Sequence, residues 1–311
     1  MGKYILKRIG FGFITVFIII TATFFLVHSV PGDPMAAGAK NLSVEAKAAF
    51  KHKYGLDKPL IQQYTTYMTN LITKGDLGDS MIYRERSIGT MIKVHAPTSG
   101  KVGGIAIVIQ VTVGVVLGII AAFNRGKFAD KVISVLVVCL VCIPSFVFAA
   151  LLQYIFAVKL RMFPVMGWGQ AKHYFIPVLA MSIGGIASYC KFTRNSTLGV
   201  IGQDYIITAK AKGVGKIALT VKHVLRNSMI PIVTMVGPSI LNIFAGSFVI
   251  ESMFSIPGLG FYYVTAVNSA DFSMVVGLTI FISSLYVLSL ILVDISYGII
   301  DPRIRVASGS R

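Results

Sequence analysis

Six long stretches of this chain are almost entirely apolar and contain no Asp, Glu, Lys or Arg. A helix crosses the ~30 Å hydrocarbon core of a bilayer with about 20 residues, and each stretch is long enough to do so. The pattern therefore predicts an all-α membrane protein with six transmembrane helices. The stretches are Ile9 to Val30, Val102 to Asn124, Val132 to Val158, Tyr174 to Cys190, Asn227 to Ile250 and Phe272 to Val293.

The distribution of Lys and Arg between these stretches predicts the orientation of the chain. The N-terminus, the second-to-third connection, residues 191–226 and the C-terminal tail hold 16 of the 29 basic residues. The short connections on the other side hold only Lys159, Arg161 and Lys172. Cytoplasmic loops are rich in Lys and Arg, so both termini are expected in the cytoplasm. The first stretch is expected to be a retained helix, because Pro31-Gly32-Asp33-Pro34 lacks a small-x-small cleavage pattern.

This topology predicts four regions in a multi-pass protein of the cytoplasmic membrane. Two helices are expected in the large extracytoplasmic segment. One is capped by Ser43 and stopped by Gly55, and the other opens at Pro59 and ends at Gly75. The regions are residues 1–30 with the first helix, the extracytoplasmic segment 31–101, a five-helix core over 102–298 that includes a cytoplasmic segment 191–226, and a tail over 299–311.

Composition agrees with a membrane protein, with 55% hydrophobic and only 13% charged residues. The formal charge of +17 raises the question of nucleic-acid binding. The basic residues flank apolar stretches and are not interleaved with aromatic residues that stack on bases, so no nucleic-acid partner is expected. Cys139, Cys142 and Cys190 lie inside apolar stretches, where cysteine is usually a small buried hydrophobe.

Residues 191–226 are too long for a simple connection, because links between bundle helices are usually about 2 to 8 residues. Two amphipathic pieces, separated by Gly213 and Gly215, carry Lys and Arg on their polar side. Such pieces suit either a helix lying on anionic lipid or a knob that enters a groove of a partner protein. The sequence pattern leaves both interpretations open.

Several ordered motifs resemble the ABC importer permeases of the dipeptide/oligopeptide group. The central match runs from Asp204 to Gly213 and from His223 to Pro231. Ile207 and Thr208 stand where the general importer signature has Glu and Ala, a variant typical of the peptide group. The other motifs are Pro31-Gly32-Asp33-Pro34, Tyr54-Gly55-Leu56-Asp57, Gly75-Asp76-Leu77-Gly78 with Ser80, Phe254 to Gly260 and Asp301-Pro302-Arg303-Ile304-Arg305.

The resemblance implies a permease subunit with defined partners. These are a homologous second permease, two ATP-binding subunits, an extracytoplasmic solute-binding protein, a peptide substrate and membrane lipid. The cytoplasmic segment is then expected to dock on the ATPase, where small side chains permit close approach. The implied coupling residues are Asp204, Thr208, Ala209, Ala211, Lys212, Gly213, His223, Arg226 and Asn227.

The chain itself is not expected to be an enzyme or to bind a cofactor. None of its four Gly-Lys pairs is followed by Ser or Thr, as a nucleotide-binding loop requires, so ATP and magnesium are expected in the partner subunits. No catalytic residue or metal ligand is assigned, because the five histidines are scattered. A secondary transporter is the alternative of another class. It would be expected to carry ionisable residues deep in its spans, whereas Gln110 and Gln153 are the strongly polar groups there.

Two further groups of residues are candidates for function. Gln153, Asn242 and Ser247, with Gly184, Gly237 and Gly246, are candidates for lining a peptide path, although small residues also serve helix packing. Asp294 or Asp301 is expected to pair with Arg226 or Lys222 and so brace the cytoplasmic segment. Nickel permeases resemble the same family, and a nickel substrate remains the alternative to a peptide.

Overall fold

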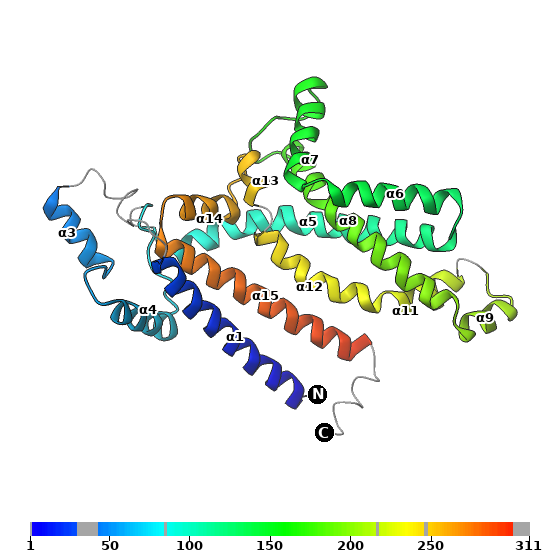
Figure 1. Cartoon of the computed structure of the whole chain (residues 1–311), viewed down its shortest axis with the longest axis horizontal. Helices are drawn as coiled ribbons and strands as arrows, with labels where there is room; N and C mark the ends of the chain where they lie inside the picture. Colours follow the sequence, from blue (N-terminus) through cyan, green and yellow to red (C-terminus); the bar gives the residue numbers. More distant parts are fainter. Residues whose placement is uncertain (1, 30–42, 84–85, 216–217, 246–247, 301–311) are drawn as a thin grey trace.

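The computed structural model describes residues 2–29, 43–83, 86–215, 218–245 and 248–300, and its regular elements are helices. Figure 1 shows an elongated bundle in which α3 and α4 lie at one end and α9 lies at the other. The elements are α1 Gly2–Ser29, α3 Val44–Lys53, α4 Leu60–Lys74, α5 Ile88–Phe123, α6 Phe128–Cys142, α7 Ser145–Leu152, the π-helix η1 Gln153–Lys159, α8 Lys172–Ile201, α9 Asp204–Ala211, the π-helix η2 Leu219–Leu225, α11 Arg226–Ser228, α12 Ile230–Ala245, α13 Phe248–Met253, α14 Leu259–Asn268 and α15 Phe272–Ile300.

Four described helices are long and apolar enough to cross a membrane. They are Leu6–Ser29, Ile88–Phe123, Lys172–Ile201 and Phe272–Ile295. The pair Phe128–Cys142 and Ser145–Lys159 becomes a fifth candidate if it is counted as one span. The predicted fifth stretch forms α12, of 16 residues, followed by α13, and α12 alone is shorter than a typical span.

The third apolar stretch is interrupted by a sharp bend. The chain bends by 101° between α6 and the α7–η1 pair. Pro144 stands at the bend as the N-cap of α7, with ψ 138°, so its backbone is extended and the helix is interrupted. Proline cannot donate the backbone hydrogen bond that continuation of α6 would need.

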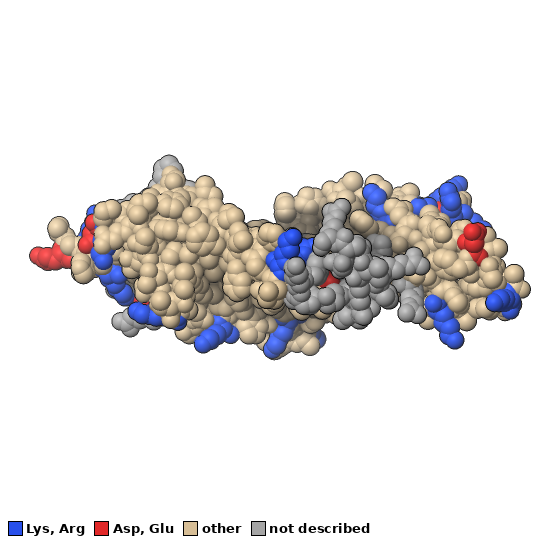
Figure 2. Space-filling view, turned by 90° about the horizontal axis from the view of Figure 1, so that it is seen from below, with Lys and Arg blue, Asp and Glu red and all other residues tan. Residues whose placement is uncertain are grey.

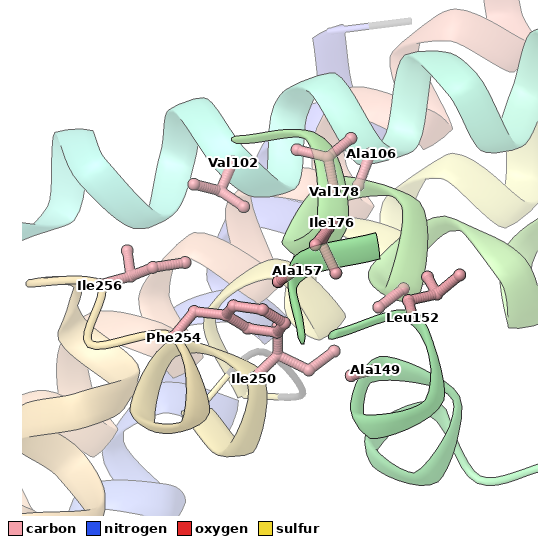
Figure 3. Packing of buried hydrophobic residues seen from close by; sticks show 11 residues of the cluster. Val102, Ala106, Ala149, Leu152, Ala157, Ile176, Val178, Ile250, Phe254 and Ile256 are labelled. Carbon is pink, nitrogen blue, oxygen red and sulfur yellow. The ribbon is translucent and has the colours of Figure 1, made fainter. Parts of the chain in front are cut away.

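The helices after the bend are held by a buried apolar cluster, shown in Figure 3. Ala149 and Leu152 of α7 lie beside Ile176 of α8, and Val102 of α5 and Phe254 close the cluster from the other sides. Close packing of such side chains stabilises the arrangement through many van der Waals contacts that are small individually and large together. The cluster therefore fixes the direction of α7 against the core.

Two helices are longer than the apolar stretches that predicted them. The second apolar stretch was placed from Val102, but α5 begins at Ile88, where Ser87 caps it by accepting from the Thr90 amide at 3.2 Å. The fourth was ended at Cys190, but α8 continues to Ile201. Hydrophobicity marks the part of a helix that faces lipid, while the polar continuations are equally helical.

The two helices predicted within residues 31–101 are confirmed as helices. Ser43 caps α3 by accepting a hydrogen bond from the Ala46 amide at 3.3 Å, and Gly55 follows with φ +67°. Pro59 precedes α4, and Gly75 ends it in the left-handed conformation, φ +63°. A residue with a Cβ is strained in that conformation, so the glycines stop these helices.

Helices α5 and α8 form the most extensive pair in the described structure. Gly114 and Gly118 lie one helical turn apart on α5 and face the backbone of α8. A Cβ at Gly114 would lie 2.6 Å from the Tyr189 Cβ, and one at Gly118 would lie 2.6 Å from the Cys190 carbonyl oxygen. The two helices thus touch through their backbones, as small-xxx-small pairs allow.

The surface between the ends of the molecule is mostly uncharged. Figure 2 shows an extended tan surface, with Lys and Arg in separate groups toward the ends and beside the grey residues. Large apolar side chains are exposed along it, including Phe13, Ile18, Val135 and Val138. Exposed apolar surface of this extent is what a lipid-facing protein presents.

Candidate functional site

A cavity of about 540 Å³ lies between α5, α8 and α12. The Gln110 side chain crosses from α5 to α8, where its Nε2 donates to the Met181 carbonyl at 3.0 Å. Tyr189 of α8 and Ser239 of α12 join their hydroxyls at 2.9 Å. The residues lining the cavity are Gly103, Ala106, Ile107, Gln110, Ser145, Met181, Gly184, Gly185, Ser188, Tyr189, Met235, Pro238, Ser239 and Ile250.

Because Gly185 has no side chain, it leaves room for the Gln110 side chain in the cavity wall. A Cβ built on Gly185 would overlap the Cδ and Oε1 atoms of Gln110. The absence of a side chain at 185 therefore lets a polar amide lie across an apolar helix pair. Gly103 and Gly184 widen the same wall, and a Cβ on Gly184 would meet nothing within 4 Å.

The candidate path residues named from the sequence have different fates. Gln153 does not line this cavity, since its exposed amide donates to the Val165 carbonyl at 2.7 Å. The Asn242 side chain, Ser247 and Gly246 lie outside the described residues. Gly184 is in the cavity wall, whereas Gly237 is a packing position whose Cβ would lie 2.9 Å from Val293. The sequence named Gln110 as mid-span and polar but did not assign it to a path.

The segment that the sequence predicts to be cytoplasmic folds, beyond the end of α8, as two short helices closed by a small apolar cluster. Ile206 and Ala209 of α9 pack on Leu219 and Val224 of η2, and all four are buried. Gly213 separates the helices at φ +78°, and the Val214 amide donates to the Ala209 carbonyl at 3.2 Å. The segment is therefore a folded unit and not an open loop.

The α9 residues divide clearly between a buried and an exposed side. Ala209 is only 8% exposed and faces η2, so its small size serves packing within the segment. Tyr205 and Ile207 are 45% and 57% exposed although they are apolar. Exposed with them are Asp204, Thr208, Lys210, Ala211, Lys212 and Gly213.

The remaining predicted coupling residues lie on or after η2. His223 is half-buried, and its carbonyl accepts from the Asn227 side-chain amide at 2.8 Å. The Arg226 side chain lies outside the described part. Ser196 of α8 donates to the Ser228 carbonyl at 3.1 Å, which fastens α11 to α8. The chain that follows the predicted coupling segment is thus attached to the helix that also forms the cavity wall.

The carboxylate of Asp130 holds α6 and α8 together. It accepts from Arg194 twice, from Nε at 2.7 Å and from Nη2 at 2.9 Å, and from the Gly126 amide at 2.9 Å. Only 4% of Asp130 is exposed. A single sequence gave no pairing signal for this contact, because the two residues are 64 positions apart.

The predicted bracing pair is not the contact that Asp294 makes. Its Oδ2 lies 3.2 Å from the Arg8 Nε, so α15 is paired with α1. Asp301 lies outside the described residues. The sequence interpretation placed both acids near the segment predicted to be cytoplasmic, because it had no information on which helix packs beside α15.

Two of the motifs named from the sequence are explained by buried carboxylates. Asp271 accepts from the Ser80 hydroxyl and from the Met81 amide, at 3.1 Å for the latter. The pKa of the nearby Tyr83 hydroxyl is raised. Burial is the main cause, and the negative charge of Asp271 raises it further. This contact ties the residues after Gly78 to the start of α15.

Glu251 performs the corresponding task at the Phe254 to Gly260 motif. Its Oε2 accepts from the Gly260 amide at 2.9 Å and the Phe261 amide at 3.3 Å, at the N-terminus of α14. A Cβ at Gly258 would overlap this carboxylate. Ser99 of α5 accepts from the Leu259 amide at 2.8 Å. The motif glycines are needed because a charged side chain lies directly against their backbone.

Cysteine and histidine positions complete the comparison with the sequence. Cys190 is buried as expected, whereas Cys139 and Cys142 are exposed on the surface of the chain, and all three are free thiols. The His28 Nδ1 lies 2.7 Å from the Phe24 carbonyl oxygen, and the His95 Nδ1 lies 3.0 Å from the Pro257 carbonyl oxygen. Among the described residues, no group of three His, Cys, Asp or Glu is arranged to hold a metal.

A multi-pass helical bundle with a cavity between its helices and a folded cytoplasmic segment is the architecture of a membrane transport component. Residues 114–306 match the family described as "Binding-protein-dependent transport system inner membrane component". Residues 1–95 match its N-terminal counterpart, "Binding-prot-dependent transport system membrane comp, N-term". The chain belongs to this family of inner membrane permease components.

Named relatives extend over nearly the whole chain. The chain is 39% identical over 306 residues to "Dipeptide transport system permease protein DppB" of Bacillus subtilis (strain 168), covering 98% of this chain and 99% of that protein. It is 38% identical over 307 residues to "Oligopeptide transport system permease protein OppB" of Haemophilus influenzae, covering 98% and 100%. It is 36% identical to the OppB protein of Escherichia coli (strain K12), with the same coverage.

Proposed function

We propose that this chain is the permease subunit of an ATP-driven importer and forms part of the path by which dipeptides or oligopeptides cross the cytoplasmic membrane. The observation that carries the proposal is the similarity to dipeptide and oligopeptide permeases across 98% of the chain. Nickel, the alternative, is not favoured by these relatives.

The cavity between α5, α8 and α12 is the portion of the path that we assign to this chain. Half of its lining residues are apolar or aromatic, and the others are three glycines, three serines and one glutamine, which offer room and a few hydrogen-bonding groups without charge. A carrier of varied peptides needs such a wall, because backbone amides are common to all peptides and side chains are not. A homologous permease would supply the opposite wall.

The exposed face of the cytoplasmic segment is the surface that we assign to an ATPase subunit. Ile207 and Ala211 lie exposed on α9 beside Lys210 and Lys212. Apolar side chains exposed at the tip of a folded unit favour a surface that contacts another protein. A connection that is simply exposed to water would not need them. ATP and magnesium would then bind in the ATPase subunits, with no catalytic group in this chain.

We further propose six spans with both termini in the cytoplasm, the extracytoplasmic segment being α3 and α4. The position of these helices at the end opposite α9 supports this orientation (Figure 1). On this proposal, α12 and α13 together supply the fifth span. The third span is supplied by α6, α7 and η1 together. An extracytoplasmic solute-binding protein would deliver the peptide at the α3–α4 end.

Uptake by an auxotroph tests the substrate. Cells lacking this chain and supplied with their required amino acid only as a short peptide should stop growing, and growth should return when the gene is restored. Free amino acid is the control and should support both strains equally. Unchanged growth on peptides together with lost accumulation of nickel would contradict the peptide proposal.

A further inference from the structure

A groove of about 300 Å³ on the outside of the bundle, between α6 and α8, has a composition unlike that of the cavity just described. Its floor and walls include Val137, Val138 and Val141 of α6 and Cys190 of α8. At one end it is bordered by Lys191, Arg194 and Asn195. Val138 and Val141 are 61% and 60% exposed, so the groove opens to the surroundings of the chain.

The charged end of the groove coincides with the boundary of the apolar helix segments. Lys191 is the first charged residue after the apolar stretch of α8, and Lys131 immediately precedes the apolar stretch of α6. Lys131 lies three residues before Ser134 and seven before Val138, so it shares their face of α6. On the proposed six-span topology, on which this inference rests, the apolar part of the groove would lie within the membrane and the basic part at the level of the headgroups.

The two lysines are available for an external anion, whereas the arginine is not. Arg194 gives Nε and Nη2 to Asp130. In the described ranges the ion pairs within 4.0 Å are Arg8–Asp294 and Arg194–Asp130, so neither Lys131 nor Lys191 has a carboxylate at that distance. Both lysines are exposed. Because Arg194 is paired with Asp130, two uncompensated positive charges remain, that of Lys191, which borders the groove, and that of Lys131, which lies on α6 one helical turn before Ser134 of the lining.

From this arrangement we infer that the α6–α8 groove binds an anionic phospholipid, with an acyl chain along Val137, Val138 and Val141 and the headgroup phosphate between Lys131 and Lys191. A neutral lipid would satisfy the apolar wall but leave both ammonium groups without a counterion. Basic positions at the cytoplasmic end of transmembrane helices attract anionic headgroups, whereas acyl chains alone do not distinguish lipids. The site lies on a different face from the cavity assigned to transport. A bound lipid would therefore affect the position of α8 and would not contact the peptide.

Native mass spectrometry of the full chain in mild detergent tests the inference. The protein is titrated with phosphatidylglycerol and, separately, with phosphatidylcholine carrying the same acyl chains. We expect retention of one phosphatidylglycerol per chain and weaker retention of phosphatidylcholine. Equal retention of the two lipids would overturn the inference, because the lysines would then contribute nothing.

Matched variants locate the site. Lys131→Gln and Lys191→Gln should each weaken phosphatidylglycerol binding about fivefold, and the double variant about 25-fold. The control is Lys210→Gln with Lys222→Gln, which removes two exposed positive charges from the cytoplasmic segment, away from the groove. An equal loss in this control would mean that general charge, and not the groove, attracts the lipid.

A third variant tests the apolar part without altering charge. Val138→Trp fills the groove and keeps both lysines, and it should also weaken phosphatidylglycerol binding. Unchanged binding in this variant would place the lipid elsewhere. In the assembled transporter, a photoreactive amino acid at position 138 should yield a lipid adduct. A cross-link to a second permease would show that protein covers the groove and would also overturn the inference.

Discussion

Arg194 and Asp130 meet in a two-pronged ion pair, with Nε 2.7 Å from Oδ1 and Nη2 2.9 Å from Oδ2. The pair joins α8 to α6 close to the coupling segment, and Asp130 is only 4% exposed. Removing one member of such a pair leaves a buried charge without compensation, which costs about 3–5 kcal/mol in buried sites.

We therefore expect Arg194→Ala to lower the thermal unfolding temperature and the amount of assembled complex. Arg194→Lys should fall between this variant and the natural protein, because lysine cannot make the two parallel hydrogen bonds. The control is Lys127→Ala, at an exposed residue in the connection between α5 and α6, close in sequence to Asp130. This change should alter stability by less than about 0.5 kcal/mol. Equal stability of Arg194→Ala and Lys127→Ala would show that the pair holds nothing together.

Gly185 and Gln110 should behave as a coupled pair in transport. Gly185→Ala places a methyl group where the Gln110 amide now lies, so the amide must leave Met181 and enter the cavity. Peptide uptake should fall severalfold while the protein still assembles. The second change Gln110→Ala should restore much of the uptake in the Gly185→Ala background, since it removes the obstructing group.

Gly118→Ala is the matched comparison for that rescue. Its Cβ would lie 2.6 Å from the Cys190 carbonyl, which is backbone and cannot be trimmed by a side-chain substitution. Overpacking of this kind costs about 1–3 kcal/mol, so this variant should lose stability as well as uptake. If Gln110→Ala restored Gly118→Ala equally well, the specific contact at Gly185 would be refuted.

Ala209 and Ala211 should separate folding of the coupling segment from docking. Ala209 is buried against η2, so Ala209→Leu should loosen the segment and raise its amide hydrogen exchange. Ala211 is exposed, so Ala211→Glu should leave folding nearly unchanged but prevent retention of the ATPase or its stimulation by loaded solute-binding protein. Normal stimulated hydrolysis with Ala211→Glu would favour a segment that lies on lipid.

The orientation is checked with reporters fused after glycines of the connections and after Ser308 of the C-terminal tail. A reporter that is active only outside the cytoplasm should work after Gly55 or Gly169, and one active only inside should work after Gly126, Gly202 or Ser308. The reason is the division of Lys and Arg between the short connections, 16 against 3. External activity after Gly202 would reverse the proposed topology.

Sequence reasoning succeeded where the responsible forces are local. The ends of α3 and α4 follow from Ser43, Gly55, Pro59 and Gly75, whose capping and backbone conformations need no distant partner. The separation of α9 from η2 at Gly213 is a further instance. Hydrophobic stretches also located the helices, although not their polar ends.

Sequence reasoning failed where a residue acts through a distant neighbour. Asp130 with Arg194, and Asp271 with Ser80, are pairs that only the packing of helices brings together. Gln110 requires a glycine on another helix to take its place in the cavity wall. The spacing of Gly114 and Gly118 was a readable signal for the α5–α8 contact, and the sequence interpretation did not use it.

The backbone contact between α5 and α8 has a mechanical consequence. Helices this close cannot slide past one another without collision of Gly114 and Gly118 with the α8 main chain, so they turn together as one rigid body. Ser196 near one end of α8 holds α11, which follows the predicted coupling segment, and α5 is 36 residues long, about 54 Å, and extends toward the opposite side. A small rotation applied by a nucleotide-driven partner would thus produce a larger displacement toward the far end of α5, where Ser99 contacts the start of α14.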